Sequence, residues 1–273
     1  MKYKTLVFDA PHLAWKQYFK MPLLTSKKGV GTSIIYGVLS SMNAKYKKYP
    51  TEYVYVCWEG REDLRKVIDP TYKVREKKDD PNIEEFFRQV NVLQEELPQL
   101  GIQSIAVKGY ESDDCLAVLA HKEELQPVLL VSGDEDMYAC LTESVDLLFN
   151  DKLINIDVFE NNFKFPVYLY PIFKAITGCG SDKVKGVKGW GDKTAKDIFK
   201  LCNNDIDKIL QFIVDKGKKE EFLHALKLTT LPYDWNYDLP IKIQKTNIDR
   251  NKLDDFFYKL NINAIHAHSF LQN

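Results

Sequence analysis

The chain has 273 residues, of which 45% are hydrophobic and 12% aromatic, so it is long and apolar enough to bury a large core. Its 38 basic and 39 acidic residues give a net charge of -1, which excludes a surface that attracts polyanions over its whole extent. No apolar run reaches the length of a membrane span, and Asp9 and Pro11 interrupt the N-terminal stretch, so we expect a globular cytoplasmic protein without a signal peptide.

Short apolar runs alternate with helical patterns along the first half of the chain. This alternation predicts an α/β fold with a mainly parallel central sheet flanked by helices. The predicted strands lie at 4–8, 53–58, 102–107 and 127–131, and the clearest helical patterns lie at 32–49 and 82–97.

The second half of the chain has a different pattern. Two further strands are predicted at 145–149 and 153–159, and the sequence is mostly helical from about residue 172 onward. We therefore predict an α/β core at 1–165 that carries the functional site, followed by a mostly helical region at 166–273. The five cysteines are widely separated, which predicts reduced thiols and neither a disulfide framework nor a zinc site.

Acidic residues follow all four of the first predicted strands. Because the carboxyl ends of parallel strands share one edge of a sheet, we expect these side chains to meet there. The acids are Asp9, Glu59, Glu111, Asp113, Asp114, Asp134 and Asp136.

The segment "GYESDDCLA" at 109–117 crowds three of these acids into four positions before a helical run. The dipole of a first helical turn favours one or two acids, but three repel one another by roughly 1 to 4 kcal/mol per close pair. A positive partner is therefore expected, which is Lys, Arg or a metal ion. An oxygen-rich pocket with few histidines suits Mg²⁺ or Mn²⁺. Two such ions can activate a water and stabilise the attacking and leaving oxygens when a phosphodiester is cleaved.

A glycine-rich segment with interspersed lysines lies at 176–199 between two helical patterns. Glycines let backbone amides approach phosphates, and the following helix adds a favourable dipole, so we interpret the hairpin at 186–191 as a phosphate-backbone clamp. An ordinary tight turn would explain the glycines but not the lysines. The candidate contacts are Lys183, Lys185, Gly186, Lys188, Gly189, Gly191, Lys193, Thr194 and Lys196.

The stretch 61–78 is locally basic, with seven basic and four acidic residues. Such a stretch can follow a phosphate backbone, and Tyr72 within it can stack on a base, although a solvated surface is an equally good explanation. Lys27 and Lys28 form a weaker candidate of the same kind. The basic residues are Arg61, Arg65, Lys66, Lys73, Arg75, Lys77 and Lys78.

These motifs together resemble the flap endonuclease and 5′ to 3′ exonuclease family, especially its bacteriophage-type members. The matching pieces are "VFDA" at 7–10, the pair Tyr72 and Lys73, "GYESDD" for G-x-E-A-D-D, "SGDEDMYACL" for S-G-D-x-D and "GVKGWGDKTA" for a helix-hairpin-helix motif. The resemblance runs nearly from end to end, and the order of the pieces is more specific than any one of them.

The resemblance implies a PIN-like 5′ nuclease that cuts branched or 5′-ended DNA and leaves 5′-phosphate and 3′-hydroxyl ends. It implies a helical arch near 65–98, metal binding by the acids above together with Asp182, catalytic roles for Lys73, Arg75 and Tyr72, and K⁺ at the glycine hairpin. A monomer with replication or single-strand-binding partners is also implied.

Two departures from the family pattern bear on the metals. Glu59 stands where an Asp is usual, and "GCGSDK" replaces G-D-x-x-D-N, so that Cys179 takes the place of one acid. Sulfur is a poor ligand for Mg²⁺, so we expect the second of two metal sites to be the weaker one. Two alternatives stay open: a related nuclease that acts on RNA in RNA–DNA hybrids, and a branched-DNA binding protein with little turnover.

Overall fold

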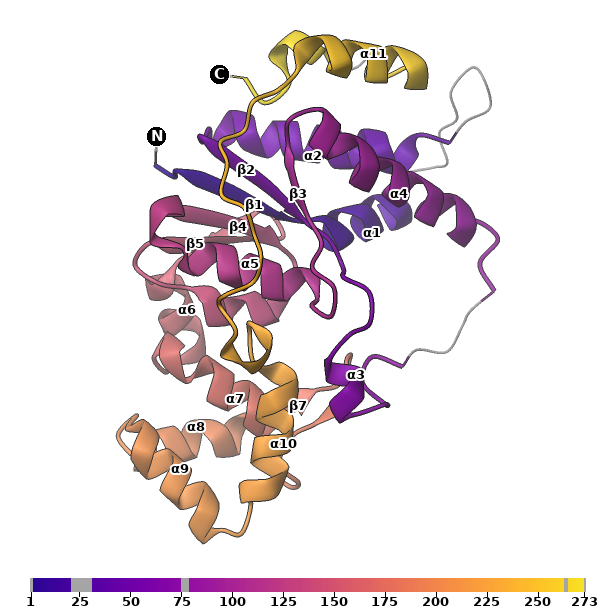
Figure 1. The fold of residues 1–273 in the computed structure, drawn as a ribbon. Helices are drawn as coiled ribbons and strands as arrows, with labels where there is room; N and C mark the ends of the chain where they lie inside the picture. The colour runs from indigo at the N-terminus through magenta and orange to yellow at the C-terminus, as the bar shows by residue number, and fades with distance from the viewer. Residues whose placement is uncertain (1, 21–30, 75–78, 263–264, 273) are drawn as a thin grey trace.

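A six-stranded sheet forms the centre of the computed structural model, which describes residues 2–20, 31–74, 79–262 and 265–272 (Figure 1). The strand order is β3-β2-β1-β4-β5-β6, and only β6 runs antiparallel to its neighbour. The predicted mainly parallel sheet is therefore confirmed. The strands are β1 (Thr5–Asp9), β2 (Tyr53–Cys57), β3 (Gln103–Ile105), β4 (Val128–Ser132), β5 (Val145–Phe149) and β6 (Lys152–Ile154).

Both faces of the sheet are covered, which is why its strands read as continuous apolar runs. In β1, Leu6 and Phe8 pack with the helices of one face, whereas Val7 between them packs with the helix of the other. The first face is covered by α1 (Ala10–Lys20), α2 (Ser33–Lys48), α4 (Ile83–Gln99) and α11 (Arg250–Leu260), and the second by α5 (Ser112–His121).

The region after the sheet is mostly helical, as predicted. It contains α6 (Ile156–Phe163), α7 (Tyr170–Thr177), α8 (Asp192–Leu201), α9 (Ile206–Asp215) and α10 (Lys219–Thr229), with the short hairpin of β7 (Gly178–Cys179) and β8 (Val184–Lys185) between α7 and α8. The predicted strand at 153–159 is wrong beyond Ile154. Asn155 accepts a hydrogen bond from the backbone N–H of Val158, and this cap begins α6 inside the apolar run.

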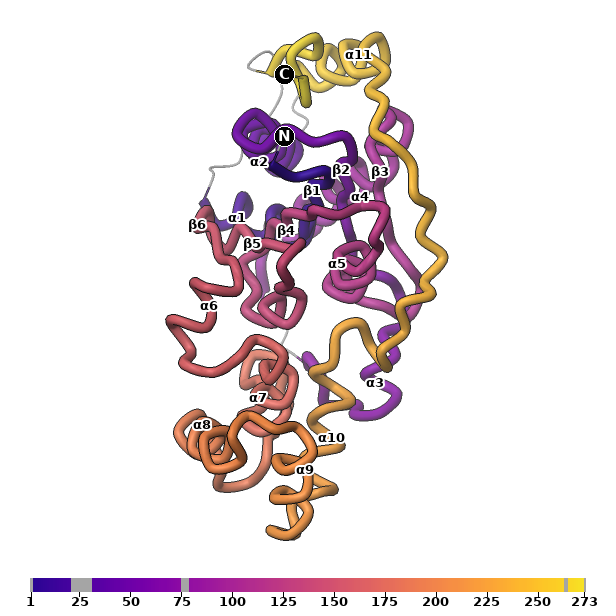
Figure 2. The backbone as a smooth tube through the Cα atoms, turned by 90° about the vertical axis from the view of Figure 1, so that its left-hand side faces the viewer, coloured from indigo at the N-terminus to yellow at the C-terminus, as the bar shows by residue number. Residues whose placement is uncertain are grey.

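The C-terminal segment returns to the sheet. Figure 2 shows the chain after α10 running along one side of the molecule to α11, at the opposite end of the molecule from α8 and α9. Thr246 accepts a hydrogen bond from the backbone N–H of Val54 in β2, and Leu253 and Phe257 of α11 are buried with the core of the first face. The boundary at residue 165 stays a prediction, and α11 lies with the core rather than with α7 to α10.

Two compositional expectations can be compared with the described residues. All five cysteines are free thiols, and only Cys179 is more than slightly exposed. None of the helices in the described part of the chain combines the length and the apolar character that crossing a membrane requires.

Candidate metal centre

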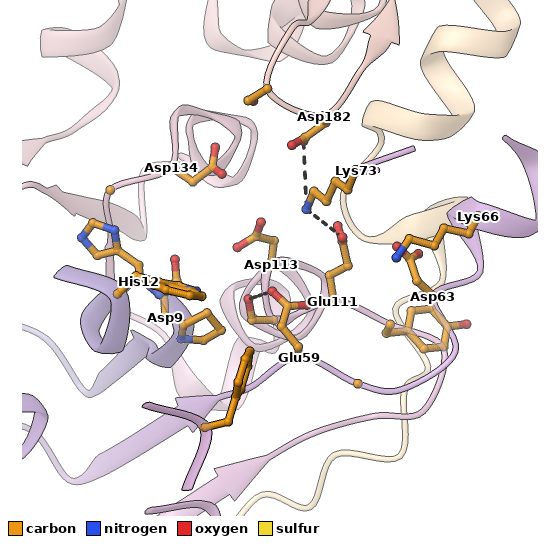
Figure 3. A pocket seen from close by; sticks show the side chains of 18 of the residues that line it. Asp9, His12, Glu59, Asp63, Lys66, Lys73, Glu111, Asp113, Asp134 and Asp182 are labelled. Carbon is orange, nitrogen blue, oxygen red and sulfur yellow. Dashed lines mark hydrogen bonds and ion pairs between the residues drawn. The ribbon is translucent and has the colours of Figure 1, made fainter. Parts of the chain in front are cut away.

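A cavity of about 900 Å³ lies at the carboxyl edge of the parallel strands (Figure 3). The parallel register aligns Asp9, the last residue of β1, with Cys57 of β2, and Glu59 and Asp134 follow β2 and β4 by two residues. The predicted site residues that line the cavity are Asp9, Glu59, Lys73, Glu111, Asp113, Asp134 and Asp182.

Three carboxyl groups that line this cavity have pKa values above their ordinary range. Burial raises the pKa of Asp9 to about 6, although Ser132 and the backbone of His12 donate hydrogen bonds to it. Burial also raises the pKa of Asp113 well above its ordinary value, helped by the charges of Asp9 and Asp134. Desolvation in the cavity, reinforced by Glu111, raises the pKa of Glu59 to about 7. The ion pairs described at the cavity join Lys73 to Glu111 and Asp182 and involve none of these three groups, so an oxygen-preferring cation fits the cavity.

Glu111 has its own cationic partner. Its carboxylate accepts a hydrogen bond of 2.7 Å from Lys73 Nζ and one of 3.0 Å from the hydroxyl of Tyr72. The ring of Tyr72 is only 3% exposed, so it cannot stack on a base in this arrangement, and the predicted stacking role is wrong for this structure. Tyr72 instead orients Glu111, and Glu111 orients Lys73 at the cavity wall.

Asp114 also points away from the cavity, so its predicted role as a metal ligand is contradicted. It is fully buried and forms two hydrogen bonds of 2.8 Å with the guanidinium of Arg65, which is 1% exposed. The backbone N–H groups of Glu111 and Tyr233 donate to it as well. Arg65 therefore cannot contact a phosphate backbone, and it ties α3 (Arg65–Ile68) to α5 and α10.

Asp136 belongs to a second group of possible ligands. The ligand atoms of Asp136, Cys179 and Asp182 lie within 4.8 Å of one another. Lys174 of α7 already contacts Asp136, with 2.6 Å between Nζ and Oδ1, and both side chains are largely buried. A divalent ion at this position would compete with an ammonium group and meet a thiol, so the residues fit it less well than they fit an ion at Asp113.

The glycine hairpin joins β8 to α8. Gly189 has a φ of +81°, and a Cβ on Gly186 would lie 2.2 Å from the carbonyl oxygen of Ile176, so both positions require glycine. Lys183, Lys185, Lys188 and Lys193 are exposed, whereas Lys196 lies over the rings of Phe163 and Phe173. The four exposed lysines are available to phosphates, and Lys196 is less so.

Some site residues were not found from the sequence, and others cannot be placed. Asp63, which lines the cavity, and Lys174, which contacts Asp136, belong to no sequence motif. Ser132, which donates a hydrogen bond to Asp9, was overlooked although it lies in the S-G-D-x-D pattern. Arg75, a predicted catalytic residue, lies outside the described residues, as do Lys27, Lys28, Lys77 and Lys78.

Comparison with known proteins gives consistent matches. Residues 4–164 match the family model described as 5′-3′ exonuclease, N-terminal resolvase-like domain. The chain is 28% identical over 278 residues to a 5′-3′ exonuclease of Aquifex aeolicus, covering 96% of this chain and 94% of the relative. It is also 28% identical over 281 residues to the thermostable DNA polymerase I of Thermus thermophilus, covering 98% of this chain but only 33% of the polymerase.

A solved structure shares the fold. The crystal structure of a bacteriophage T5 flap endonuclease variant, in a complex with DNA and metal ions, superposes with a TM-score of 0.70 at 19% identity. The alignment covers 84% of this chain and 89% of that one.

The Arg65–Asp114 pair leads to a prediction about stability. Arg65→Met leaves a buried carboxylate unpaired, so we expect the free energy of unfolding to fall by about 3 to 5 kcal/mol. Lys108→Met, which breaks the exposed pair with Glu62, is the control and should cost less than about 1 kcal/mol. Urea unfolding measures both, and equal effects of the two substitutions would contradict the assigned role of Arg65.

The raised pKa values lead to a prediction about pH. With a pKa of about 6 for Asp9 and about 7 for Glu59, the metal-free folded chain holds more protons than the unfolded one, so these groups lower its stability as pH rises from about 4 to 7. Mg²⁺ needs the charged carboxylates, so it should stabilise the fold more at pH 8 than at pH 5.

Urea unfolding in EDTA and in excess Mg²⁺, at each of the two pH values, measures the stabilisation by Mg²⁺. At pH 8 the free energy of unfolding should be about 2.7 kcal/mol higher in Mg²⁺ than in EDTA when Mg²⁺ is 100 times its Kd. Glu59→Gln is the matched variant and should shift the pH dependence to lower pH. The same Mg²⁺ effect at both pH values would show that these carboxyl groups do not bind the ion.

Proposed function

The chain belongs to the 5′-3′ exonuclease family, and on that premise we propose that it is a divalent-metal-dependent 5′ nuclease acting on branched or 5′-ended DNA. Its products would carry 5′-phosphate and 3′-hydroxyl ends. The observation that carries this proposal is the meeting of Asp9, Asp113 and Asp134 in one cavity, although more than 100 residues of sequence separate the first from the others.

The donor set supports Mg²⁺ or Mn²⁺ as the cofactor. The cavity offers carboxylate oxygens from three strand ends and from the first turn of α5, and these hard ligands suit either ion. When bound, such ions activate water and stabilise charge on the attacking and leaving oxygens of a phosphodiester. Asp9, Asp113 and Asp134 would hold the tighter ion, with Glu59 on the same wall.

The basic residues of the cavity would position the substrate. Lys73, between Asp182 and Glu111, and Lys66, beside Asp63, line the same cavity as the carboxylates and would hold the scissile phosphate (Figure 3). The backbone N–H of Lys73 donates to the carbonyl of Asp182, so its segment is tied to the β7–β8 hairpin. The glycine hairpin at 186–191, with the exposed lysines around it, would bind the phosphates of a DNA duplex, and K⁺ would bind at its glycines.

The segment 65–98 would act as the arch over a single strand, because its two ends are held by different parts of the protein. At one end α3 contacts α10, and at the other α4 packs on α2. Arg75 would contact phosphate within it. We further propose a monomer that works with replication or single-strand-binding proteins.

Charge removal at the cavity tests the activity. Asp134→Asn keeps the oxygen that accepts from the backbone N–H of Asp136 but removes the negative charge that would bind the metal ion. We therefore expect the cleavage rate of end-labelled 5′-flap DNA in Mg²⁺ to fall about 100-fold or more. EDTA should abolish cleavage by the wild type. Asp254→Asn on the exposed side of α11 is the control and should leave the rate unchanged.

The same assay separates the alternatives. Faster metal-dependent cleavage of an RNA–DNA hybrid than of flap DNA would favour the ribonuclease alternative. Tight binding of flap DNA without any Mg²⁺-dependent product would contradict the nuclease proposal.

The second group of ligands gives a prediction about metal stoichiometry. We propose that the ion at Asp136, Cys179 and Asp182 binds more weakly than the ion at Asp113, because of the thiol and the ammonium of Lys174. Cys179→Asp should tighten the weaker site at least about 10-fold towards Mg²⁺, and Cys179→Ser should not. Calorimetric titration measures both, and two equal sites in the wild type would contradict the proposal.

A further inference from the structure

An aromatic wall borders the acidic cavity. Trp15 and Phe19 of α1 and Phe87 of α4 line the same cavity as Asp9 and Asp113. Asp9 directly precedes α1, and Phe19 lies ten residues further on, about 15 Å along the helix axis. The wall therefore extends from the carboxylates to a point beyond the reach of a single phosphate group.

The outer rings of this wall are unusually exposed. Phe19 is 80% and Phe87 is 51% exposed, although large aromatic side chains are normally buried. The inner ring, Phe86, is 3% exposed and stacks on Trp15 with 4.1 Å between centroids. Phe86 thus fixes Trp15 against the core, and Trp15 in turn stacks with Phe19 at 5.8 Å. Core packing accounts for Phe86 but not for the exposed rings.

We propose that the aromatic wall of Trp15, Phe19 and Phe87 stacks unpaired bases of a single strand whose phosphates enter the acidic cavity. This inference rests on the proposed nuclease function and deepens it by naming the bases next to the cut as ligands. It also replaces Tyr72, whose buried ring cannot serve as a stacking surface.

The chemistry of the cavity selects this occupant. A nucleotide presents a flat apolar base and a phosphate, and the cavity presents exposed rings together with the lysines Lys66 and Lys73. A protein segment would use the rings but would gain nothing from the metal-binding carboxylates. Because every base has a π face, stacking on phenylalanine is tolerant of sequence.

Binding of a duplex with a single-stranded 5′ extension tests the proposal. The full chain in EDTA is titrated onto fluorescent DNA, so that no cleavage occurs. Phe19→Ala and Phe87→Ala should each raise the Kd about 10-fold, and Phe19→Trp should not. Tyr258→Ala on α11, whose ring is 85% exposed and does not line the cavity, is the matched control and should bind as the wild type does.

A second substrate shows whether the bases are the ligands. When the extension carries abasic sites, the wild type should bind more weakly and the Phe19→Ala penalty should disappear. An equal penalty on both extensions, or Phe19→Ala binding indistinguishable from Tyr258→Ala, would overturn the aromatic wall. Equal thermal midpoints for the variants show that the fold is intact.

Cleavage assays distinguish this failure from that of the proposed function. If the wild type cuts flap DNA in Mg²⁺ and Phe19→Ala binds and cuts equally well, only the aromatic wall is wrong. If the wild type forms no Mg²⁺-dependent product, the proposed nuclease function is wrong. The proposal that the stacked bases lie next to a cut is then wrong as well.

Discussion

Repulsion among carboxylates held at one edge of a parallel sheet is the constraint on which this structure depends. The fold resolves it in two ways. Asp114 and Glu111 have built-in cations, Arg65 and Lys73, within the protein. Among the residues that the structure describes, no cation forms an ion pair with Asp9 or Asp113, and burial leaves the pKa of each raised. The compensated acids hold the fold together, whereas the uncompensated ones create a site that a divalent ion stabilises.

The sequence predicted the sheet and the meeting of its acids because both follow from the chain's own pattern. Apolar runs bounded by acids specify strands and their ends, and parallel pairing brings those ends together. It could not tell Asp113 from Asp114. A helix turns by about 100° per residue, so adjacent acids face the cavity and the core, and only the position of Arg65 decides which is which. The start of α6 was missed because the apolar run around it suits a strand, although Asn155 within that run caps the helix.

The residues that sequence reasoning missed act through partners distant along the chain. Lys174 matters because α7 brings it to Asp136, and the exposed rings of α1 and α4 matter because they share a cavity with Asp9. These contacts join the acidic cavity to its surroundings. The hydrogen bond from the backbone N–H of Lys73 to the carbonyl of Asp182 links the cavity to the β7–β8 hairpin, and Trp15, Phe19 and Phe87 line the same cavity as the carboxylates.

The proposed nuclease function depends on the binding of a cation by carboxylates that lie far apart in the sequence and line one cavity. Anomalous diffraction from crystals soaked in Mn²⁺ locates such an ion directly. We expect a peak at coordinating distance from Asp113 and from Asp9 or Asp134, stronger than any peak beside Cys179. Peaks only on the outer surface, or none in the cavity at saturating Mn²⁺, would contradict it.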